Sequence, residues 1–443
     1  TDDTTNIWLS DANTELFLRK EAHLLPKMQR LYRVWCGTLN QLVIVLTSGV
    51  PRDVSARDEF QFFTRAFLNC HLYFTTTATL FDKLVERYHC PMTIEHTEQE
   101  LEQFYTIQRA VLGTLQHWYS AYPKHWTIAT RERAIQLALD AKQSPNEQLR
   151  TAGRYLEKVI QSRKAGGMSV HSARFIQKAL KAPNPPDPIL PKQRYYALLD
   201  VDSLELARQV TITDHRAYAA IEPHELLSGN WNSSNYEKKS QCIGLLGVVE
   251  RFNHTTNIVM HLIVSESNLQ KRKRIMMKII DIMGHLLTLN NFFGLMAFVS
   301  CTNSASIKRL KHTFSVLPDK TMERLAEYKR ICDPEGHYQN YRQLYESANS
   351  PAVPYTGCFL QDLLYIEDGN ENEICGMINF HKKSLLMKTI DKMLKHQETK
   401  YDLRTVTSIQ TILDCYPQMT EKQLYDMSLS IEPRNVTLKE LRK

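Results

Sequence analysis

Leu364 and Asp368 are the residues of this chain whose types and spacing most suggest chemistry. They lie four residues apart, so they share one helical face if the apolar spacing from Phe359 to Leu363 is helical. Gly369-Asn370 is a typical helix stop directly after them. A leucine beside a carboxylate at an exposed helix end adds little to a core. Such a pair at an exposed tip fits a wedge for a nucleotide–phosphate–magnesium site.

A second helix is predicted beyond this turn. Asn372 is a typical helix cap, and it has acidic neighbours that would favour the positive end of a helix. From Ile374 to Met393 apolar residues recur on one face, which indicates a helix of about 35–40 Å if it continues to Gln397. The two helices would form a hairpin that carries the leucine and the carboxylate at its tip.

Motifs that would let the chain itself bind or cleave a nucleotide are absent from the sequence. It contains neither GxxxxGK[ST] nor GxGxxG, and no serine or cysteine nucleophile signature. His89-Cys90 and His215 have no partner at metal-ligand spacing, so packing or surface roles are favoured. The nine cysteines include no CxxC pair, which argues against a disulfide framework and a zinc ribbon. We therefore expect no metal site, no cofactor and no covalent catalysis.

The composition is that of an ordinary globular protein. With 443 residues, 43% hydrophobic and 23% charged, the chain should form about two or three domains with substantial cores. The net charge of +7 is spread along the chain, so general surface charge is favoured over a nucleic-acid patch. The basic run Gln270–Arg274 could be a nuclear-localisation cluster, but it precedes an apolar helical pattern and fits a solvated helix face better. We expect no nucleic-acid partner.

Direct membrane insertion is not expected either. Gln41–Leu46 is too short to span a bilayer, and Ile279–Leu289 is interrupted by Asp281 and His285. No signal peptide is visible, and the cysteine usage fits a reducing, cytoplasmic compartment. Because the chain begins at Thr1, we expect it to be a piece of a longer protein, with membrane recruitment through other regions or partners.

Two helical regions separated by a linker are predicted, and the expected fold class is all-α. The first region, residues 1–165, has helical patterns over Thr14–Ser48, Asp58–Tyr88 with a break at Thr75–Thr77, Thr97–Tyr119 and Thr130–Lys164. The linker, residues 166–194, contains Gly166-Gly167 and the proline-rich stretch Pro183–Pro191. The second region, residues 195–434, should hold about nine or ten helical segments, and residues 435–443 form a tail.

The hairpin segment resembles the helical hairpin of the Ras-family guanine-nucleotide exchange factors of the Son-of-sevenless type. The motifs shared with that family are Val353-Pro354, Gly357, Asp362–Ile366, Asp368-Gly369-Asn370, Ile378-Asn379-Phe380 and Lys382-Lys383. Further motifs occur in family order at Leu204–Gln209, Pro223–Leu226, Trp231, Phe252–Asn257, Asn290–Gly294, Asn303, Leu310–Phe314, His337-Tyr338 and Ile431–Arg434. The resemblance covers about Ala197 to Arg434. A weaker resemblance to the family's Ras exchanger motif covers about residues 31–130, notably Cys36–Leu39 and Phe60–Tyr73.

The resemblance implies a helical Ras exchanger motif domain and a larger all-helical catalytic domain with a protruding hairpin. It implies release of GDP from a Ras-type GTPase, in which Leu364 crowds the magnesium position and Asp368 takes the place of phosphate. Asn303, His337, Tyr338, Tyr355, Met296, Gln361 and Asn370 would contact the GTPase. Ile378, Asn379 and Phe380 would support the hairpin. Family members commonly have glutamate where this chain has Asp368, which shortens the reach of the carboxylate.

Two alternatives remain from the sequence. The same fold could be a catalytically weak or inactive scaffold that binds a GTPase or an adaptor, or a helical scaffold unrelated to GTPases. The partner could be of the Ras, Rap or Ral type, because specificity depends on the partner's own surface. A second GTPase at an allosteric site, as in some relatives, is a further hypothesis.

Overall fold

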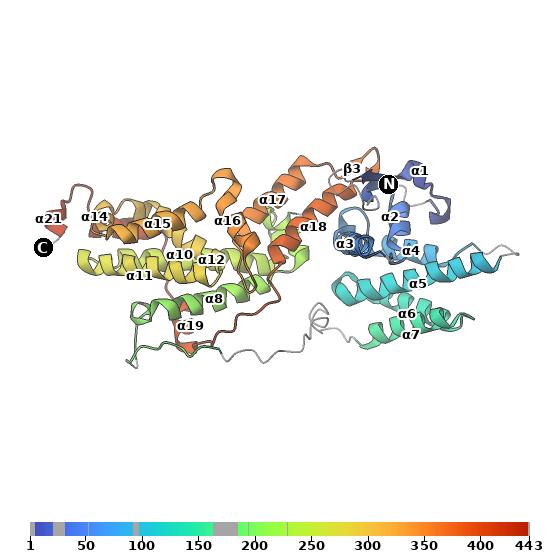
Figure 1. Cartoon of the computed structure of the whole chain (residues 1–443), viewed down its shortest axis with the longest axis horizontal. Coiled ribbons are helices and arrows are strands. Elements are labelled where there is room, and N and C mark those ends of the chain that lie inside the picture. The colour runs from blue at the N-terminus through green and yellow to red at the C-terminus, as the bar shows by residue number, and fades with distance from the viewer. Residues whose placement is uncertain are drawn as a thin grey trace. The chain divides into compact units, whose positions relative to one another are not determined.

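The computed structural model describes residues 5–20, 32–51, 53–91, 97–162, 185–193, 195–227 and 229–441. The chain divides into two compact units. The N-terminal unit comprises Thr1–Lys178 together with Leu364–Lys388, and the C-terminal unit comprises Ala179–Leu363 together with Thr389–Lys443. Helix α17 (Thr356–Gly369) begins in the C-terminal unit and ends in the N-terminal unit (Figure 1). Residue 31, at which the resemblance to the Ras exchanger motif begins, lies outside the described residues, as do Gly166-Gly167 and the start of the proline-rich stretch.

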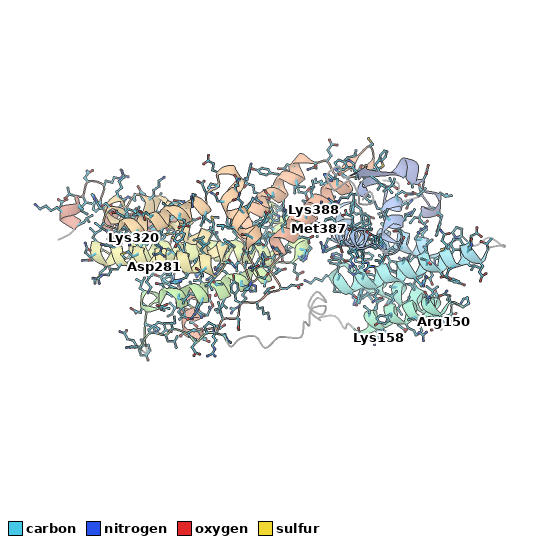
Figure 2. All side chains as sticks on the ribbon, in the orientation of Figure 1. Arg150, Lys158, Asp281, Lys320, Met387 and Lys388 are labelled. Carbon is cyan, nitrogen blue, oxygen red and sulfur yellow. The ribbon has the colours of Figure 1, made fainter. Side chains whose placement is uncertain are left out.

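The N-terminal unit is mainly helical. Its helices are α1 (Ala12–Glu15), α2 (Leu39–Leu46), α3 (Val54–Cys70), α4 (Thr77–Tyr88), α5 (Glu98–Ala121), α6 (Ile128–Lys142) and α7 (Glu147–Ser162), with 3₁₀ turns at Ile7–Leu9, His71–Tyr73 and Pro123–His125. The break at Thr75–Thr77 is confirmed, because the Thr76 side chain caps α4 by accepting from the Thr79 amide. The Thr130–Lys164 pattern is two helices, separated at Pro145. In Figure 2, Arg150 and Lys158 extend from α7.

A small four-stranded sheet completes this unit. Its strands are β1 (Leu16–Lys20), β2 (Tyr32–Gly37), β3 (Glu373–Ile374) and β4 (Met377–Ile378), in the antiparallel order β1-β2-β4-β3. The helical reading of Thr14–Ser48 is therefore wrong at Leu16–Lys20 and at Tyr32–Gly37, because mixed leucine spacings fit either period. The all-α class is nevertheless confirmed, since the sheet is short and helices dominate both units.

The second hairpin helix begins later than predicted. α18 runs over Phe380–Leu394, and Asn372 does not cap it. The Asn372 carbonyl instead accepts from the Asn379 amide at 2.9 Å, at the end of the β3–β4 pair that is opposite the turn. Cys375 and Gly376 form the turn with φ of +51° and +76°, as a tight hairpin turn requires. Pairing of Ile378 with Gly37 of β2 fixes this backbone as strand.

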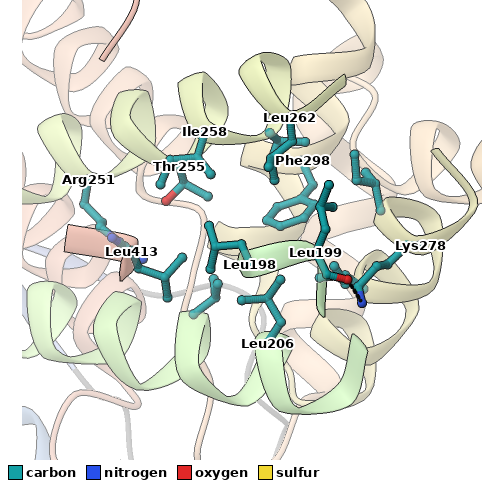
Figure 3. Close-up of a pocket in the computed structure, with 14 residues that line it drawn as sticks. Leu198, Leu199, Leu206, Arg251, Thr255, Ile258, Leu262, Lys278, Phe298 and Leu413 are labelled. Carbon is teal, nitrogen blue, oxygen red and sulfur yellow. Dashed lines mark hydrogen bonds between the residues drawn. The ribbon is translucent and has the colours of Figure 1, made fainter. Parts of the chain in front are cut away.

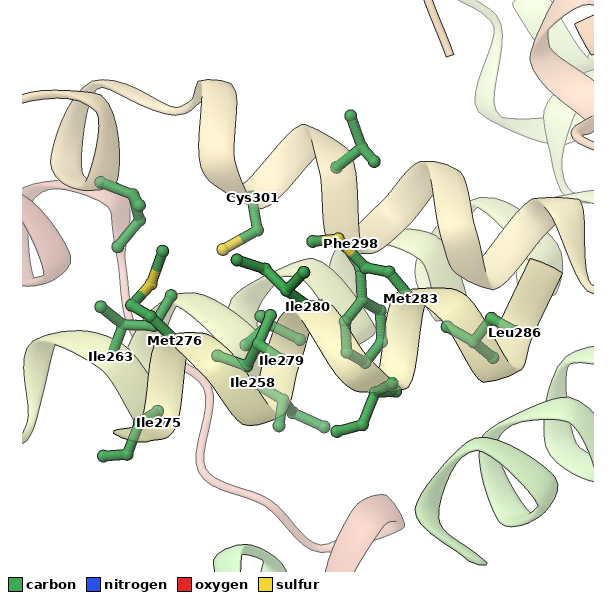
Figure 4. Close-up of a cluster of buried hydrophobic side chains, with 14 of the residues drawn as sticks. Ile258, Ile263, Ile275, Met276, Ile279, Ile280, Met283, Leu286, Phe298 and Cys301 are labelled. Atoms are coloured by element: carbon green, nitrogen blue, oxygen red, sulfur yellow. The ribbon is translucent and has the colours of Figure 1, made fainter. Parts of the chain in front are cut away.

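The C-terminal unit is built on the long helices α10 and α11. Its helices are α8 (Ser203–Ala219), α9 (Tyr236–Lys239), α10 (Ile243–Val264), α11 (Leu269–Thr288), α12 (Phe292–Asn303), α13 (Ala305–Lys308), α14 (Lys311–Ser315), α15 (Asp319–Ile331), α16 (Glu335–Ser347), the start of α17, the end of α18, α19 (Thr407–Asp414), α20 (Glu421–Ile431) and α21 (Leu438–Leu441). Short 3₁₀ turns occur at Leu198–Asp200, Pro223–Leu226 and Asn230–Asn232. Figure 4 shows α11 side chains such as Ile280 and Met283 beside Phe298 and Cys301 of α12. Gln270–Arg274 lies in the first turn and a half of α11, where Arg272 is fully buried and hydrogen-bonded to Thr313, so the run is partly structural.

One cavity lies inside this core (Figure 3). It measures about 20 Å³ and is lined mainly by apolar side chains, among them Leu206, Ile258 and Phe298. That volume suits a single water molecule at most. Lys278 closes one side and donates to the carbonyls of Leu199, at 2.8 Å, and Val201. The cavity is a packing defect of the core and is too small for a nucleotide.

No helix in the described part of the chain is long and apolar enough to cross a membrane. Within the same residues, no three His, Cys, Asp or Glu side chains gather in a way that could hold a metal ion.

Candidate functional site

The start of α17 is tied to the start of α12 in the C-terminal unit. The Val353 carbonyl accepts from the amides of Phe292 and Phe293 at 3.0 and 3.2 Å, and the Val353 amide donates to the Asn290 carbonyl at 3.0 Å. The two bonds to the Val353 carbonyl satisfy amides in the first turn of α12, which have no acceptor within their own helix. Because Val353 precedes α17 by only three residues, the root of the helix is fixed to the core.

An aromatic platform lies beside this root, and we define it as Phe252, Phe293, Tyr338 and Tyr355. The Tyr355 ring is 5.5 Å from the Tyr338 ring and 6.0 Å from the Phe252 ring, which is itself 5.5 Å from the Phe293 ring. Tyr338 and Tyr355 are half-buried and pack against the core. Burial raises the pKa of Tyr355 well above its usual range, so its hydroxyl stays neutral. The platform offers a half-exposed apolar surface with hydroxyl groups.

His337 and Tyr338 lie in an unusual turn. Gly336, His337 and Tyr338 have φ of +62°, +57° and +61°, so three successive residues adopt the left-handed conformation. For residues other than glycine this conformation costs of order 1–3 kcal/mol each, and such strain often marks functional sites. His337 is exposed. Its carbonyl accepts from Arg342 Nε at 2.7 Å, so a side chain from the part of α16 that follows this kink holds the turn.

The two predicted contact residues on α12 differ in exposure. Asn303 is the last residue of the helix and is exposed. Met296 is only 5% exposed and belongs to the hydrophobic core on which Tyr338 and Tyr355 pack. Met296 is therefore part of the core and exposes almost none of its side chain.

On α17, Leu364 and Asp368 share one face of the helix, as the sequence predicts, and Gln361 lies on the same stripe. Gln361 and Leu364 are partly exposed, and Asp368 is exposed. The predicted stop at Gly369-Asn370 is confirmed, since α17 ends at Gly369. Asn370 acts as part of this stop, because its side-chain amide donates to the Ile366 carbonyl at 3.0 Å.

Within the N-terminal unit, a buried lysine closes the end of α17. Lys382 is 2% exposed, and its ammonium donates to the carbonyls of Glu367 and Asn370 at 2.9 and 2.8 Å. It also pairs with the Glu367 carboxylate at 2.8 Å. All three of its donors are thus used. A cation at the carbonyl end of a helix is favourable. The lysine fixes the residues that flank Asp368.

The three predicted support residues take separate structural positions in the same unit. Ile378 pairs with Gly37 of β2. Asn379 accepts from the Lys382 amide at 3.1 Å, which caps α18, and donates to the Glu371 carbonyl at 2.8 Å. Phe380 is 1% exposed, with its ring 4.6 Å from that of Phe63 on α3. These contacts join β4 and the start of α18, the second arm of the hairpin, to β2, Glu371 and α3.

Sequence reasoning missed three other anchors of this arm. His381 stacks on Trp35 with ring centres 4.0 Å apart. Tyr73 donates to Glu367 at 2.7 Å, and its ring lies 3.8 Å from the Lys383 ammonium. Burial lowers the pKa of Lys383 to about 8. The only signal in the sequence was the pair Lys382-Lys383 inside an apolar pattern, which fits a solvated face equally well.

Comparison with known proteins identifies two domains in the chain. Residues 205–384 match the RasGEF domain, and residues 33–137 match the RasGEF N-terminal motif. The first range contains the aromatic platform, the left-handed turn and the whole hairpin tip. The second contains most of β2, the helices α2 to α5 and most of α6.

Individual relatives match over most of the chain. Ras guanine nucleotide exchange factors J and I of Dictyostelium discoideum are each 32% identical, over 412 and 408 residues and 91% of this chain. Exchange factor A of the same organism is 28% identical over 98% of this chain. The chain spans about half the length of factors J and I, 48% and 47%, and 72% of factor A. These matches assign the chain to the Ras guanine nucleotide exchange factor family, with a RasGEF domain that follows a RasGEF N-terminal motif.

Proposed function

We propose that this chain promotes the release of GDP from a Ras-type small GTPase. The observation that carries the proposal is the RasGEF domain, whose matched range includes α17 with Gln361, Leu364 and Asp368 on one stripe. The names of the relatives support the same partner class. The activity is regulatory, because nucleotide leaves unchanged and no covalent bond is formed or broken.

The proposed mechanism acts on the nucleotide pocket of the GTPase. Small GTPases hold nucleotide through a phosphate loop, a magnesium ion and mobile switch segments. Leu364 would exclude magnesium, which requires oxygen ligands in near-octahedral geometry. Asp368 would repel phosphate and accept hydrogen bonds from the donors that phosphate leaves. Since the chain would bind the nucleotide-free GTPase more tightly than the loaded one, it weakens nucleotide binding by the same factor.

The aromatic platform would take an apolar segment of the GTPase. Tyr338 and Tyr355 are half-buried aromatic side chains with polar tips, a residue type common at binding hot spots. His337 and Asn303 are exposed and polar, which suits hydrogen bonds at the rim of such a contact. Met296 is almost fully buried, so it would contribute through the core on which the two tyrosines pack and not through a direct contact.

The proposed domain limits are residues 1–165 for the N-terminal helical region, 166–194 for the linker, 195–434 for the catalytic domain and 435–443 for the tail. The RasGEF match at residues 205–384 lies inside the proposed catalytic domain. Residues 364–388 nevertheless group with the N-terminal unit, so the folded units do not follow the order of the sequence. Most of the linker lies outside the described residues.

Release of fluorescent GDP from a panel of Ras, Rap and Ral proteins tests the proposal. We expect acceleration on at least one GTPase and a loss of at least tenfold with Leu364→Ala. Met322→Ala is the control, because Met322 is an exposed apolar residue (36%) on α15, outside the proposed contact surface. No acceleration on any member of the panel would overturn the proposal.

A second candidate function is a scaffold that binds a GTPase without releasing nucleotide. The shorter carboxylate of Asp368, where the family commonly has glutamate, favours it. Under this alternative the chain would bind a nucleotide-free GTPase in calorimetry while leaving the release rate unchanged.

A further inference from the structure

Arg342 joins two separate parts of the proposed GTPase-binding surface. From its position on α16, its Nε donates to the His337 carbonyl at 2.7 Å. Its terminal nitrogens donate to the two Asp362 carboxylate oxygens at 2.8 and 2.9 Å, and one of them also reaches the Cys358 carbonyl at 3.3 Å. One guanidinium group therefore bonds the left-handed turn on one side and α17 on the other.

The turn is the part that most needs such a bond. His337 and Tyr338 both adopt left-handed φ and ψ, a conformation that surrounding structure must maintain. Within the turn, the Tyr338 amide reaches the Pro334 carbonyl only at 3.4 Å. The 2.7 Å bond from Arg342 is much shorter and charge-assisted. It fixes the peptide that joins the exposed His337 to the platform residue Tyr338.

The other contact of Arg342 sets the rotation of α17 about its axis. Asp362 and Cys358 are one turn apart on one flank of the helix. Successive residues of a helix are separated by about 100° around its axis. The stripe that contains Gln361, Leu364 and Asp368 therefore lies about 100° from the flank that carries Asp362. A two-pronged arginine–carboxylate contact defines orientation more strictly than a single bond. The contact thus determines the direction in which the stripe faces.

The Arg342–Asp362 pair is not a buried core element. The two side chains are 28% and 30% exposed, and the guanidinium lies 5.6 Å from the Phe359 ring. Partly exposed ion pairs contribute little to the free energy of folding. Its geometry therefore matters more than its contribution to stability.

We propose that Arg342 is a positioning residue, which holds the His337-Tyr338 turn and the start of α17 in the arrangement that receives the GTPase. This inference rests on the proposed exchange function. It assigns no direct contact with nucleotide to Arg342. The residue acts through the carbonyl of His337 and through Asp362.

The test uses Arg342→Met, which keeps the aliphatic stem and removes every donor, and Arg342→Lys, which can reach one partner but not both. Arg324→Met is the matched control, because Arg324 on α15 makes a 2.6 Å ion pair with Asp281 on α11 in the same unit. Asp281 is labelled in Figure 2. Release rates are measured at increasing GTPase concentration to separate kcat from KM, alongside thermal melting.

We expect Arg342→Met to lower kcat/KM at least tenfold with a melting temperature close to that of the control. Arg342→Lys should recover part of the loss. Asp362→Asn, which leaves the bond to His337, should lower kcat more than it raises KM. If Arg342→Met exchanges nucleotide as fast as Arg324→Met, the inference is overturned. It is also overturned if Arg342→Met and Arg342→Lys both lose exchange activity only to the extent that they unfold. If the wild-type chain itself releases no nucleotide, the proposed function fails and this inference fails with it.

Discussion

The Tyr355 ring lies directly over Gly357, so closely that a β-carbon on Gly357 would be 2.4 Å from the Tyr355 hydroxyl oxygen. No real β-carbon tolerates that distance. The first turn of α17 thus lacks a side chain at the point where the aromatic platform crosses it. Gly357 is needed for close approach and not for backbone freedom.

Gly357→Ala should displace the Tyr355 ring and weaken GTPase binding, although alanine is the better helix former by about 1 kcal/mol. Calorimetry with a nucleotide-free GTPase measures the loss. Gly247→Ala is the control, because Gly247 lies inside α10 and an added β-carbon there would meet nothing within 4 Å. The control should be neutral or stabilising, and equal affinity for both variants would show that Tyr355 does not need its present position.

Tyr338→Ala should reduce the affinity for nucleotide-free GTPase by about 2 kcal/mol or more, as truncation of an aromatic hot spot does. The change also removes a ring 5.5 Å from Tyr355. Tyr338→Phe separates the two contributions, because it keeps the ring and removes only the hydroxyl. Normal affinity for Tyr338→Ala would place the binding surface elsewhere.

Phe380→Ala should destabilise the N-terminal unit by about 3–5 kcal/mol, the usual cost of truncating a buried phenylalanine. The ring is 1% exposed and lies 4.6 and 6.4 Å from the rings of Phe63 and Phe67. Thermal melting of Phe380→Ala, Phe63→Ala and the double variant gives a coupling energy. Additive losses would mean that the two rings stabilise the unit independently.

A chain that begins at Lys192 should be less soluble, less active, or both. It would lack α3 and β2, which cover Phe380 and pair with Ile378. An apolar ring and a strand edge would then be exposed, and both promote aggregation. Light scattering and nucleotide release measure the two effects. Unchanged activity and melting temperature in the shortened chain would contradict the role assigned to the N-terminal unit.

The arms of the hairpin show what the sequence could predict. The first arm was predicted to its last residue, because the spacing from Phe359 to Leu363 and the stop at Gly369-Asn370 are local signals. The start of the second arm was not. The segment 373–378 is strand only because β2, far away in the chain, pairs with it. A pattern read in one window cannot contain that partner.

The same limit applies to charged residues. Lys382 and Lys383 are basic, and a sequence pattern places such residues in solvent, but both are almost fully buried. Their partners are the carbonyl end of α17 and the ring of Tyr73, which only the folded chain brings near. Arg342 was missed for a similar reason, since neither the left-handed turn nor Asp362 identifies it in the sequence.

Lys383 should make the stability of the N-terminal unit depend on pH. Burial lowers its pKa to about 8 in the folded chain, against about 10.4 when unfolded. Between these values the unfolded chain holds a proton that the folded chain has lost, so stability should rise with pH. Melting from pH 8 to pH 9.5 should show a gain of about 2 kcal/mol at most. Lys383→Met should flatten this slope, whereas Lys158→Met, on the exposed face of α7, should keep it. Equal slopes in all three proteins would assign the pH dependence to other groups.

Asp368 tests whether the hairpin tip acts electrostatically. The residue is exposed at the end of α17, and its carboxylate is one methylene shorter than that of glutamate, so it falls about 1.5 Å short of the same point. Charge-assisted hydrogen bonds are optimal near 2.7–2.9 Å and tolerate little such slack. Asp368→Glu should therefore match or raise the rate of nucleotide release, and Asp368→Asn should lower it by removing the charge that opposes phosphate. Stopped-flow release with saturating exchange factor measures the rates. Glu373→Gln is the control, because it removes an exposed charge from the same hairpin. If the Asp, Asn and Glu forms release nucleotide equally fast, the carboxylate does not act on phosphate. If, in addition, the wild-type rate equals that of the GTPase alone, the scaffold alternative gains support.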